Sequence, residues 1–160
     1  MADSVASRLA RIIALVVPLA LLGGAYISQY GFGLQPCEMC WWQRYPHFAA
    51  LAFAGLAIVR PDARLLVWLA ALSLAASGAI GAFHAGVEYG WWEGVTACTA
   101  DLGAPGADPL DAILNAPLIR CDVAPWSLLG ISLAGWNFLF STAAALAVIL
   151  LLTMKGKGRP

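Results

Sequence analysis

LLVWLAALSLAASGAIGAFHAGV, residues 65–87, is a run of 23 residues without an aspartate, glutamate, lysine or arginine. About 20 consecutive apolar residues are enough for a helix to cross a hydrocarbon layer roughly 30 Å thick. The run therefore predicts a membrane-spanning helix, and the rest of the chain can be arranged around it.

Three further apolar stretches lie at about residues 12–29, 43–59 and 127–153. The second is short, but Trp41 and Trp42 precede it, and tryptophans are common where a helix meets the membrane surface. Pro46 then falls in the first turn, where a missing N–H is tolerated. The sequence predicts an all-α membrane protein, a bundle of four transmembrane helices forming one domain over residues 1–160, with outer loops at 30–42 and 88–126.

Composition supports this class. The chain is 61% hydrophobic and 11% charged, with a mean hydropathy of +0.78, whereas soluble domains carry about 25% charged residues. The net charge is zero, so there is no general electrostatic signature of nucleic-acid binding. Arg8, Arg11 and the small residues 23–25 imitate a cleaved signal peptide. The apolar run continues through Tyr26 and Ile27, which favours a retained helix.

The distribution of charge predicts the orientation. Cytoplasmic loops are enriched in lysine and arginine. With four spans, seven of the nine basic residues share a side with both termini, and seven of the nine acidic residues lie on the other side. We expect both termini in the cytoplasm. In a Gram-negative cell both outer loops would then lie in the periplasm.

The second outer loop contains a further helical pattern. Asp108-Pro109 is typical of a helix start, and apolar residues follow at close to helical spacing up to Ile119. One interpretation is a short amphipathic helix on the membrane surface. An irregular loop with scattered apolar residues is an equally good interpretation.

All four cysteines fall on the predicted periplasmic side: Cys37 and Cys40 in the first loop, Cys98 and Cys121 in the second. Disulfides persist in that compartment. Three uses compete there. Structural disulfides could staple the loops. A zinc site is disfavoured, because Cys98 and Cys121 lack the close spacing of a second zinc knuckle. Thiol–disulfide exchange is the third.

The sequence PCEMCWWQR, residues 36–44, favours exchange. A Cys-x-x-Cys disulfide closes a very short loop, so it constrains the unfolded chain little. Cys40 lies at the expected start of a helix, where the helix dipole favours a thiolate. Arg44 follows one turn later on the same face, where a fixed cation would stabilise an anion. The alternative for Arg44 is a membrane-interface anchor.

Electrons taken by such a pair need an acceptor. His84 and Glu88 lie one turn apart near the outer end of the run 65–87, and ionisable residues at that depth indicate function. The alternative for His84 is an interfacial side chain paired with Glu88 or water. The chain has no nucleotide-binding glycine motif and no Cys-x-x-Cys-His haem motif. Membrane quinone remains by elimination, with Arg44 and His84 as candidate contacts. His47 is assigned to packing at the interface, and Asn137, Ser132 and Thr142 to interhelical hydrogen bonds.

Three stretches resemble the DsbB family of disulfide bond formation proteins. PCEMCWWQRYP, residues 36–46, is similar to that family's Cys-x-x-Cys-x-x-Gln-Arg-x-Pro signature. FHAGVE, residues 83–88, looks like its third-span motif, and CDVAPWSLLGISLAGWNFL, residues 121–139, resembles its entry into the fourth span. The resemblance covers nearly the whole chain, with the motifs in family order.

The resemblance implies a quinone-dependent thiol oxidase. Its partner would be a soluble periplasmic DsbA-type oxidase of thioredoxin fold, joined to Cys98 in a mixed disulfide. Resting disulfides would be Cys37–Cys40 and Cys98–Cys121. Cys121 would attack Cys37, and Cys40 would pass electrons to ubiquinone or menaquinone beside Arg44 and His84.

Two alternatives remain for the whole chain. Enzymes of the vitamin K epoxide reductase type perform similar chemistry in four-helix bundles, but their Cys-x-x-Cys lies late, near the last helix of the bundle. Here it precedes the second span. The other alternative is a structural or interaction membrane protein whose outer loops are stapled by disulfides.

Overall fold

The computed structural model describes residues 5–95 and 119–154. These residues form four long helices: α1 (Val5–Gly31), α2 (Glu38–Val59), α3 (Arg64–Glu88) and α5 (Leu133–Thr153). Two short strands, β1 (Ser127–Leu128) and β2 (Ile131–Ser132), precede α5. The predicted surface helix near residues 108–119 lies outside the described part except for Ile119. Cys98 lies outside it too.

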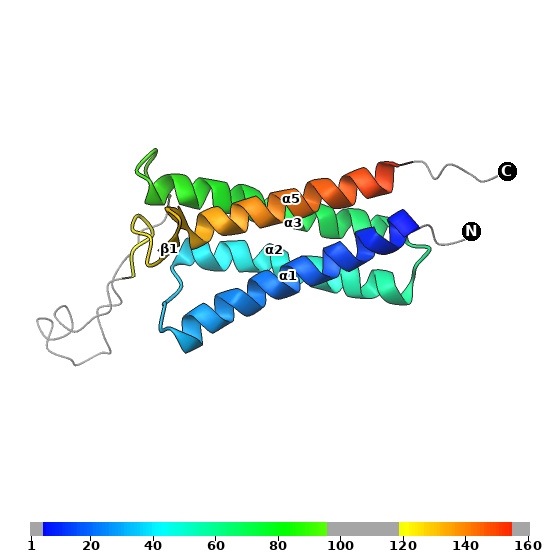
Figure 1. Cartoon of the computed structure of the whole chain (residues 1–160), viewed down its shortest axis with the longest axis horizontal. Coiled ribbons are helices and arrows are strands. Elements are labelled where there is room, and N and C mark those ends of the chain that lie inside the picture. The colour runs from blue at the N-terminus through cyan, green and yellow to red at the C-terminus, as the bar shows by residue number, and fades with distance from the viewer. Residues whose placement is uncertain (1–4, 96–118, 155–160) are drawn as a thin grey trace, which may run out of the picture.

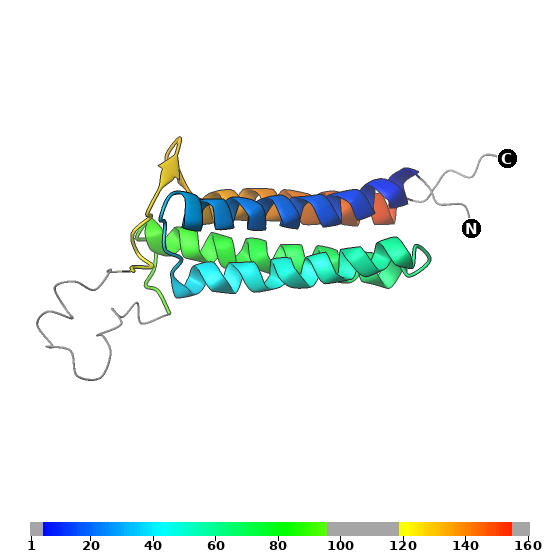
Figure 2. The ribbon, with the colours of Figure 1, turned by 90° about the horizontal axis from the view of Figure 1, so that it is seen from below.

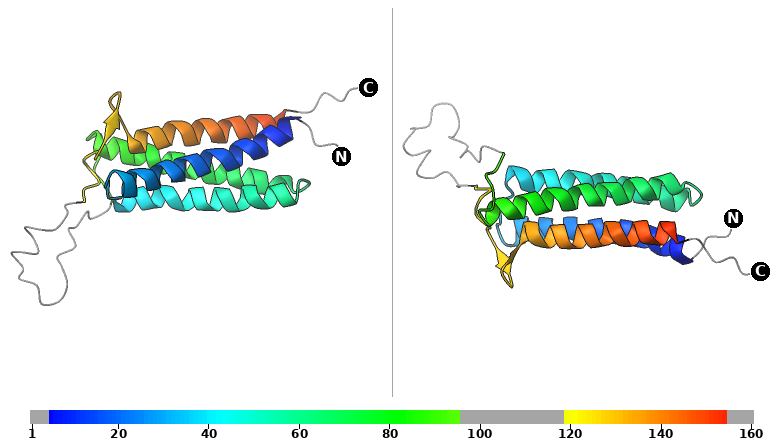
Figure 3. Two further views of the ribbon diagram at one scale, coloured as in Figure 1. Left: turned by 60° about the horizontal axis from the view of Figure 1, so that its bottom comes forward. Right: turned by 90° about the horizontal axis from the view of Figure 1, so that it is seen from above.

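The four helices form an up-and-down bundle (Figure 1). Helix α3 packs against both α2 and α5, and α1 completes the ring by packing against α2 and α5. Viewed from the side, α1 and α5 form one layer and α2 and α3 the other (Figure 2). The start of α1 and the end of α5 lie at one end of the bundle, opposite the hairpin (Figure 3). The all-helical prediction is confirmed.

Within the described residues, three helices are long and apolar enough to cross a membrane: α1, α3 and α5. Helix α2 is of similar length, but polar residues occupy its first turns, among them Gln43, Arg44 and His47. Helix α2 runs alongside the other three helices (Figure 2). A crossing of the membrane by all four helices nevertheless stays a prediction.

Small residues form much of the core. One buried cluster lies toward the end of the bundle where α1 begins and α5 ends. It includes Ala10, Ala14, Ala54, Ala57 and Ala70. Small side chains let helix backbones approach closely, which is how helices associate in lipid. Large apolar side chains such as Val16 and Leu19 in α1 are instead exposed on the outside of the bundle, as expected of surfaces that face hydrocarbon.

The helix boundaries differ from the predicted spans in two places that affect the site. Helix α2 already begins at Glu38, so Cys40 lies within its first turn. Helix α5 begins at Leu133, six residues after the predicted start of the last span. The intervening residues form a hairpin because Leu129 and Gly130 both adopt positive φ, which reverses the chain between the paired residues Leu128 and Ile131.

Arginines connect the helices at the end of the bundle that is far from the cysteines. Arg11 of α1 donates from Nη1 to the carbonyl oxygen of Pro61 at 3.0 Å. Arg64 of α3 donates from Nη2 to the carbonyl oxygen of Leu152 at 2.7 Å. These contacts place basic side chains at the end where α1 begins and α5 ends, which agrees with the predicted charge asymmetry.

Candidate functional site: two thiols between two cavities

Cys37 caps the N-terminus of α2. Its backbone is extended, and its sulfur accepts a hydrogen bond from the Cys40 amide at 3.3 Å. The two sulfur atoms are 3.1 Å apart, and both residues are free thiols. Pro36 precedes the cap and disfavours helical backbone at residue 35. Because Cys40 lies three residues after Cys37 in the first turn of α2, its sulfur returns to the side of the Cys37 sulfur.

The cap determines which sulfur carries negative charge. The pKa of Cys37 is lowered to about 4, chiefly because the Cys40 thiol hydrogen-bonds to its sulfur; burial opposes this, and His84 adds to it. Orphan N–H groups at a helix start also favour an anion there. The expected helix start at Cys40 predicted a thiolate there, but in this dithiol state the structure favours Cys37. The helix is capped at Cys37, three residues before Cys40, which explains the difference.

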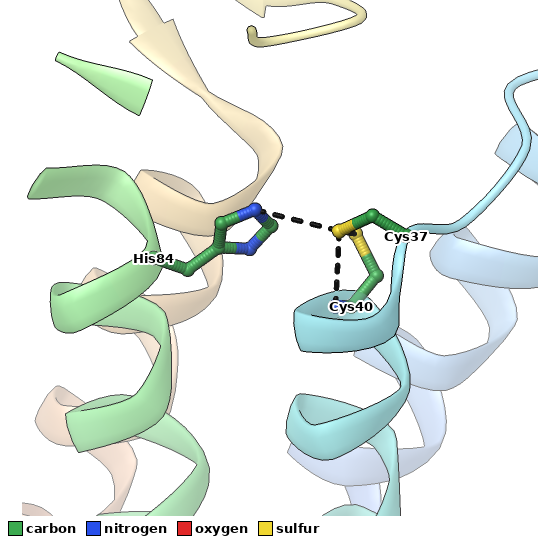
Figure 4. A group of neighbouring side chains, drawn as sticks. All are labelled: Cys37, Cys40 and His84. Atoms are coloured by element: carbon green, nitrogen blue, oxygen red, sulfur yellow. Dashed lines mark hydrogen bonds between the residues drawn. The ribbon is translucent and has the colours of Figure 1, made fainter. Parts of the chain in front are cut away.

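His84 approaches the pair from α3. Its Nε2 lies 3.5 Å from the Cys37 sulfur (Figure 4) and 3.8 Å from Oε1 of Glu88 one turn later. All three side chains are buried or nearly so. The predicted proximity of His84 and Glu88 is therefore present, and the histidine faces a sulfur as well.

A buried glutamine decides the tautomer of His84. Gln43 Nε2 donates to the carbonyl oxygen of Met39 at 3.2 Å, and a carbonyl can only accept. The same Nε2 lies 2.8 Å from His84 Nδ1, so Nδ1 accepts and the ring proton sits on Nε2. His84 is thus a hydrogen-bond donor toward the Cys37 thiolate even when it is neutral.

This tautomer bears on metal binding. The ligand atoms of Cys37, Cys40 and His84 lie within 4.8 Å of one another, a donor set that suits zinc. A metal would need a lone pair on Nε2, the nitrogen that carries the proton while Gln43 donates to Nδ1. Glutamine reorientation would also break its bond to the Met39 carbonyl. The arrangement favours a stabilised thiolate over a metal site.

Arg44 is buried on the other side of the pair. Its Nη1 donates to Gln29 Oε1 at 2.6 Å and its Nη2 to the Ala25 carbonyl at 3.3 Å, both in α1. Its guanidinium also lies over the rings of Tyr26 and Trp41, 4.9 and 4.8 Å from the centroids. Within the described ranges no carboxylate pairs with it. Its contacts with α1 argue against a side chain that reaches out to water.

Two cavities flank the cysteines. The first, here called the Arg44 cavity, has a volume of about 230 Å³ and an apolar wall from α1; its other lining residues include Cys40, Gln43, Arg44, His47 and Asn137. The second, the His84 cavity, has a volume of about 310 Å³ and is lined by Cys37, Cys40, His84, Glu88 and Arg120, among others. Cys40 borders both. His84 and Arg44, predicted as a joint ligand site, line different cavities.

Cys121 completes the group of cysteines that the structure describes. It is buried and packs in one cluster with Cys37, Met39 and Val87. It is disulfide-bonded, whereas Cys37 and Cys40 are thiols. The structure therefore brings three of the four predicted cysteines to one end of the bundle; the fourth, Cys98, lies outside the described residues.

Several polar residues, most of them buried, had no predicted role in the site. Gln43, His47, Ser77, Asn137 and Ser141 form a continuous hydrogen-bonded network between α2, α3 and α5. His47 is 3% exposed, so its assignment to interfacial packing is wrong. Asn137 does bond between helices, as expected. The sequence signal was available: Gln43 and His47 are four residues apart and share a helix face.

Fold and site together define a helical membrane protein that carries a reactive dithiol at one end of its bundle. Residues 7–151 match the family model described as disulfide bond formation protein DsbB. The disulfide bond formation protein B of Acidovorax sp. (strain JS42) is 30% identical over 169 residues, covering 99% of this chain and 94% of the relative. That of Polaromonas sp. (strain JS666 / ATCC BAA-500) is 31% identical over 170 residues, covering 98% and 96%. No solved structure matches the chain.

The chain belongs to the DsbB family. It is accordingly a disulfide-forming oxidoreductase of the membrane, and the prediction made from its three motifs is confirmed at this level.

Proposed function

We propose that this protein is a thiol:quinone oxidoreductase of the bacterial inner membrane. It reoxidises a periplasmic DsbA-type dithiol oxidase and passes the electrons through two cysteine pairs to membrane quinone. All four long helices span the membrane in this proposal, with both termini in the cytoplasm and the cysteines on the periplasmic side.

The observation that carries the proposal is the position of Cys40. Its side chain borders both the His84 cavity and the Arg44 cavity. On the first side lie Ile119, Arg120 and Val123, from the segment that contains Cys121. On the second side lies a mostly apolar space with a fixed cation. A thiol pair in this position can receive electrons from one direction and deliver them in the other.

The cysteine route follows from in-line exchange between thiolate and disulfide. The partner's thiolate breaks the Cys98–Cys121 bond and forms a mixed disulfide with Cys98, which frees the Cys121 thiolate. Cys121 then attacks the sulfur of Cys37 and displaces Cys40. The partner's second thiol attacks the mixed disulfide and releases Cys98. Cys98 then attacks Cys121 in the Cys121–Cys37 disulfide, which re-forms Cys98–Cys121 and releases the Cys37 thiolate. Both electrons then reside on Cys37 and Cys40.

In this proposal the described structure, in which Cys121 is in a disulfide while Cys37 and Cys40 are thiols, is assigned to the end of the route. Packing of Cys121 in one cluster with Cys37 supports direct exchange between them. His84 then stabilises the Cys37 thiolate as it is released, by donating from Nε2.

The Arg44 cavity fits a quinone headgroup. Its apolar wall suits the ring, and Arg44 keeps three of its five N–H donors free of the bonds to Gln29 and Ala25. A bound quinone would accept two electrons from the Cys37 thiolate and Cys40 thiol, one proton from the Cys40 thiol and one from water. Arg44 contributes a fixed positive charge that favours negative charge beside Cys40, and the rings of Tyr26 and Trp41 hold its orientation.

Quinone reduction by the purified protein in detergent, with a reduced DsbA-type partner as electron donor, tests the proposal. We expect turnover by the wild type, none by Cys40→Ser, and a rate lower by about tenfold or more in Arg44→Ala, as for loss of an electrostatic contact. Arg60→Ala, at the far end of α2, is the matched control and should retain the wild-type rate.

Other outcomes would identify the alternatives. If the wild type reduces no quinone and its disulfides remain intact in the presence of the partner, the cysteines are structural staples. If quinone is reduced with a small dithiol but not with the thioredoxin-fold partner, the chemistry resembles that of the vitamin K epoxide reductase type.

A further inference from the structure

The polar network behind the Arg44 cavity has only one consistent arrangement of hydrogens. Asn137 Nδ2 donates to the Ser77 carbonyl at 3.2 Å, and this carbonyl can only accept. The amide oxygen Oδ1 of Asn137 therefore faces the other way. There it accepts from Ser141 Oγ at 2.9 Å and lies 2.8 Å from His47 Nε2.

Asn137 thereby sets the tautomer of His47. Since Oδ1 of Asn137 accepts, His47 Nε2 must carry the proton. The neighbouring Ser77 hydroxyl leads to the same tautomer. Its one proton is donated to the Gln43 carbonyl at 2.9 Å. It therefore accepts a hydrogen bond from His47 Nε2, which is also 2.9 Å away. In the neutral ring Nδ1 is then left with a lone pair.

His47 Nδ1 has no hydrogen-bond partner although it is buried, and His47 lines the Arg44 cavity. A buried acceptor without a donor costs free energy unless a bound molecule supplies one. Arg44 therefore offers N–H donors to this cavity, and His47 is a residue of its lining that carries a buried acceptor without a donor.

We propose that His47 Nδ1 accepts a hydrogen bond from a hydroxyl group of the reduced acceptor, so that the Arg44 cavity binds hydroquinone more tightly than quinone. This inference rests on the proposed function. Both forms present oxygen atoms to the walls, but a quinone carbonyl has lone pairs only and repels Nδ1. A hydroquinone hydroxyl donates to it.

The preference has a redox consequence. A site that binds the reduced form of an acceptor more tightly raises the midpoint potential of the bound acceptor. For a two-electron couple a tenfold preference corresponds to about 30 mV. His47 would in this way favour electron transfer from the Cys37 thiolate and Cys40 thiol. Their oxidation to a disulfide supplies two electrons and one proton, and water supplies the second proton that converts quinone into hydroquinone.

The test measures binding of both forms without turnover. A short-chain benzoquinone and its hydroquinone are titrated anaerobically into the full-length Cys40→Ser protein in detergent, and quenching of tryptophan fluorescence gives the two dissociation constants. We expect His47→Leu to lower the preference for hydroquinone about tenfold, as for loss of one buried hydrogen bond. His47→Asn, which places an amide oxygen near the position of Nδ1, should restore part of it.

Ser141→Ala is the matched control. Ser141 bonds to the same Asn137 oxygen but does not line the cavity, so the preference should stay as in the parent protein. An unchanged preference in His47→Leu, or an equal loss in Ser141→Ala, would overturn the role of His47 and leave the proposed function standing. If neither form binds the parent protein, the quinone site itself is overturned and this inference with it.

Discussion

At the scale of single residues, the Cys37 thiolate determines how the dithiol responds to pH. The pKa of Cys37 is lowered to about 4 by the hydrogen bond from Cys40, while two negative sulfur atoms 3.1 Å apart would repel, so Cys40 retains its proton. The thiolate stabilises the reduced protein fully above the ordinary thiol pKa of 9.0, and this stabilisation is lost as the pH falls through about 4.

We therefore predict that reduction of the Cys37–Cys40 disulfide takes up one proton per two electrons. Between about pH 5 and pH 8 the midpoint potential should fall by about 30 mV per pH unit, half the value for two protons. Redox titration of the Cys98→Ala/Cys121→Ala protein with a thiol buffer measures the slope. A slope near 59 mV would mean that Cys37 is an ordinary thiol.

His84 makes a separate contribution to the same thiolate. His84→Leu removes the donor 3.5 Å from the Cys37 sulfur, so the pKa of Cys37 should rise, on the order of one unit for a lost hydrogen bond. The ultraviolet absorbance of the thiolate against pH reports it. His47→Leu is the matched control, because His47 belongs to the same network but does not touch the sulfur; an equal shift there would contradict a direct role of His84.

At the scale of helices, α3 and α5 approach closely at a glycine. A Cβ at Gly81 would lie 3.0 Å from the Ala134 carbonyl, from Asn137 Nδ2 and from the Phe138 amide. Gly81→Ala should therefore push α5 away, with a loss of about 1–3 kcal/mol of stability. Gly23→Ala in α1, where a Cβ meets nothing within 4 Å, should stabilise by up to about 1 kcal/mol through helix propensity.

Thermal unfolding in detergent, followed by circular dichroism, compares the two glycine variants. Because Gly81 borders Asn137, the Gly81→Ala protein should also lose affinity for quinone, whereas Gly23→Ala should not. Similar melting temperatures for both variants would mean that the α3–α5 contact tolerates separation.

The hairpin before α5 contains a strained residue. Leu129 has φ of 54° and is 86% exposed. Residues other than glycine, asparagine and aspartate adopt that region at a cost of about 1–2 kcal/mol. The turn requires positive φ at both central positions, for which Asn-Gly is preferred. Leu129→Asn should thus slow hydrogen exchange at Ile131, whose amide lies in the hairpin. Faster exchange would show that Leu129 holds the hairpin by apolar contacts.

At the scale of the whole molecule, the helices could be predicted because lipid leaves few alternatives. Runs such as residues 65–87 must satisfy their backbone groups internally, and length alone then indicates a helix. The hairpin could not be predicted in this way, because Ser127–Ser132 is as apolar as the helix that follows. Only the positive φ of Leu129 and Gly130 separates them, and leucine gives no signal for it.

The candidate site, too, could be predicted only in part from the sequence. The thiol pair and Arg44 followed from spacing on a helix face. Which sulfur carries the negative charge depends on where α2 is capped. The cap is Cys37, three residues before Cys40, and the sequence pattern did not resolve that position. The roles of Gln43 and His47 depend on contacts with Ser77, His84 and Asn137, thirty or more residues away in the chain. The shared helix face of Gln43 and His47 can be read from their spacing, but the partners that they bond to cannot.

The arrangement of the bundle also predicts what the second cysteine pair contributes to stability. The four helices pack against one another around a complete ring, and arginine contacts join them at the end remote from the cysteines. Neither depends on the segment between α3 and β1. Replacing both cysteines in Cys98→Ala/Cys121→Ala should therefore shift the melting temperature of the bundle by only a few degrees, chiefly from the lost Cys121 packing against Cys37 and Met39. Differential scanning calorimetry of the variant and the oxidised wild type measures this, with Gly81→Ala as the destabilised reference. A fall as large as that of the reference or larger would mean that the disulfide holds the bundle together, in which case it could not open and close during exchange without loosening the Arg44 cavity.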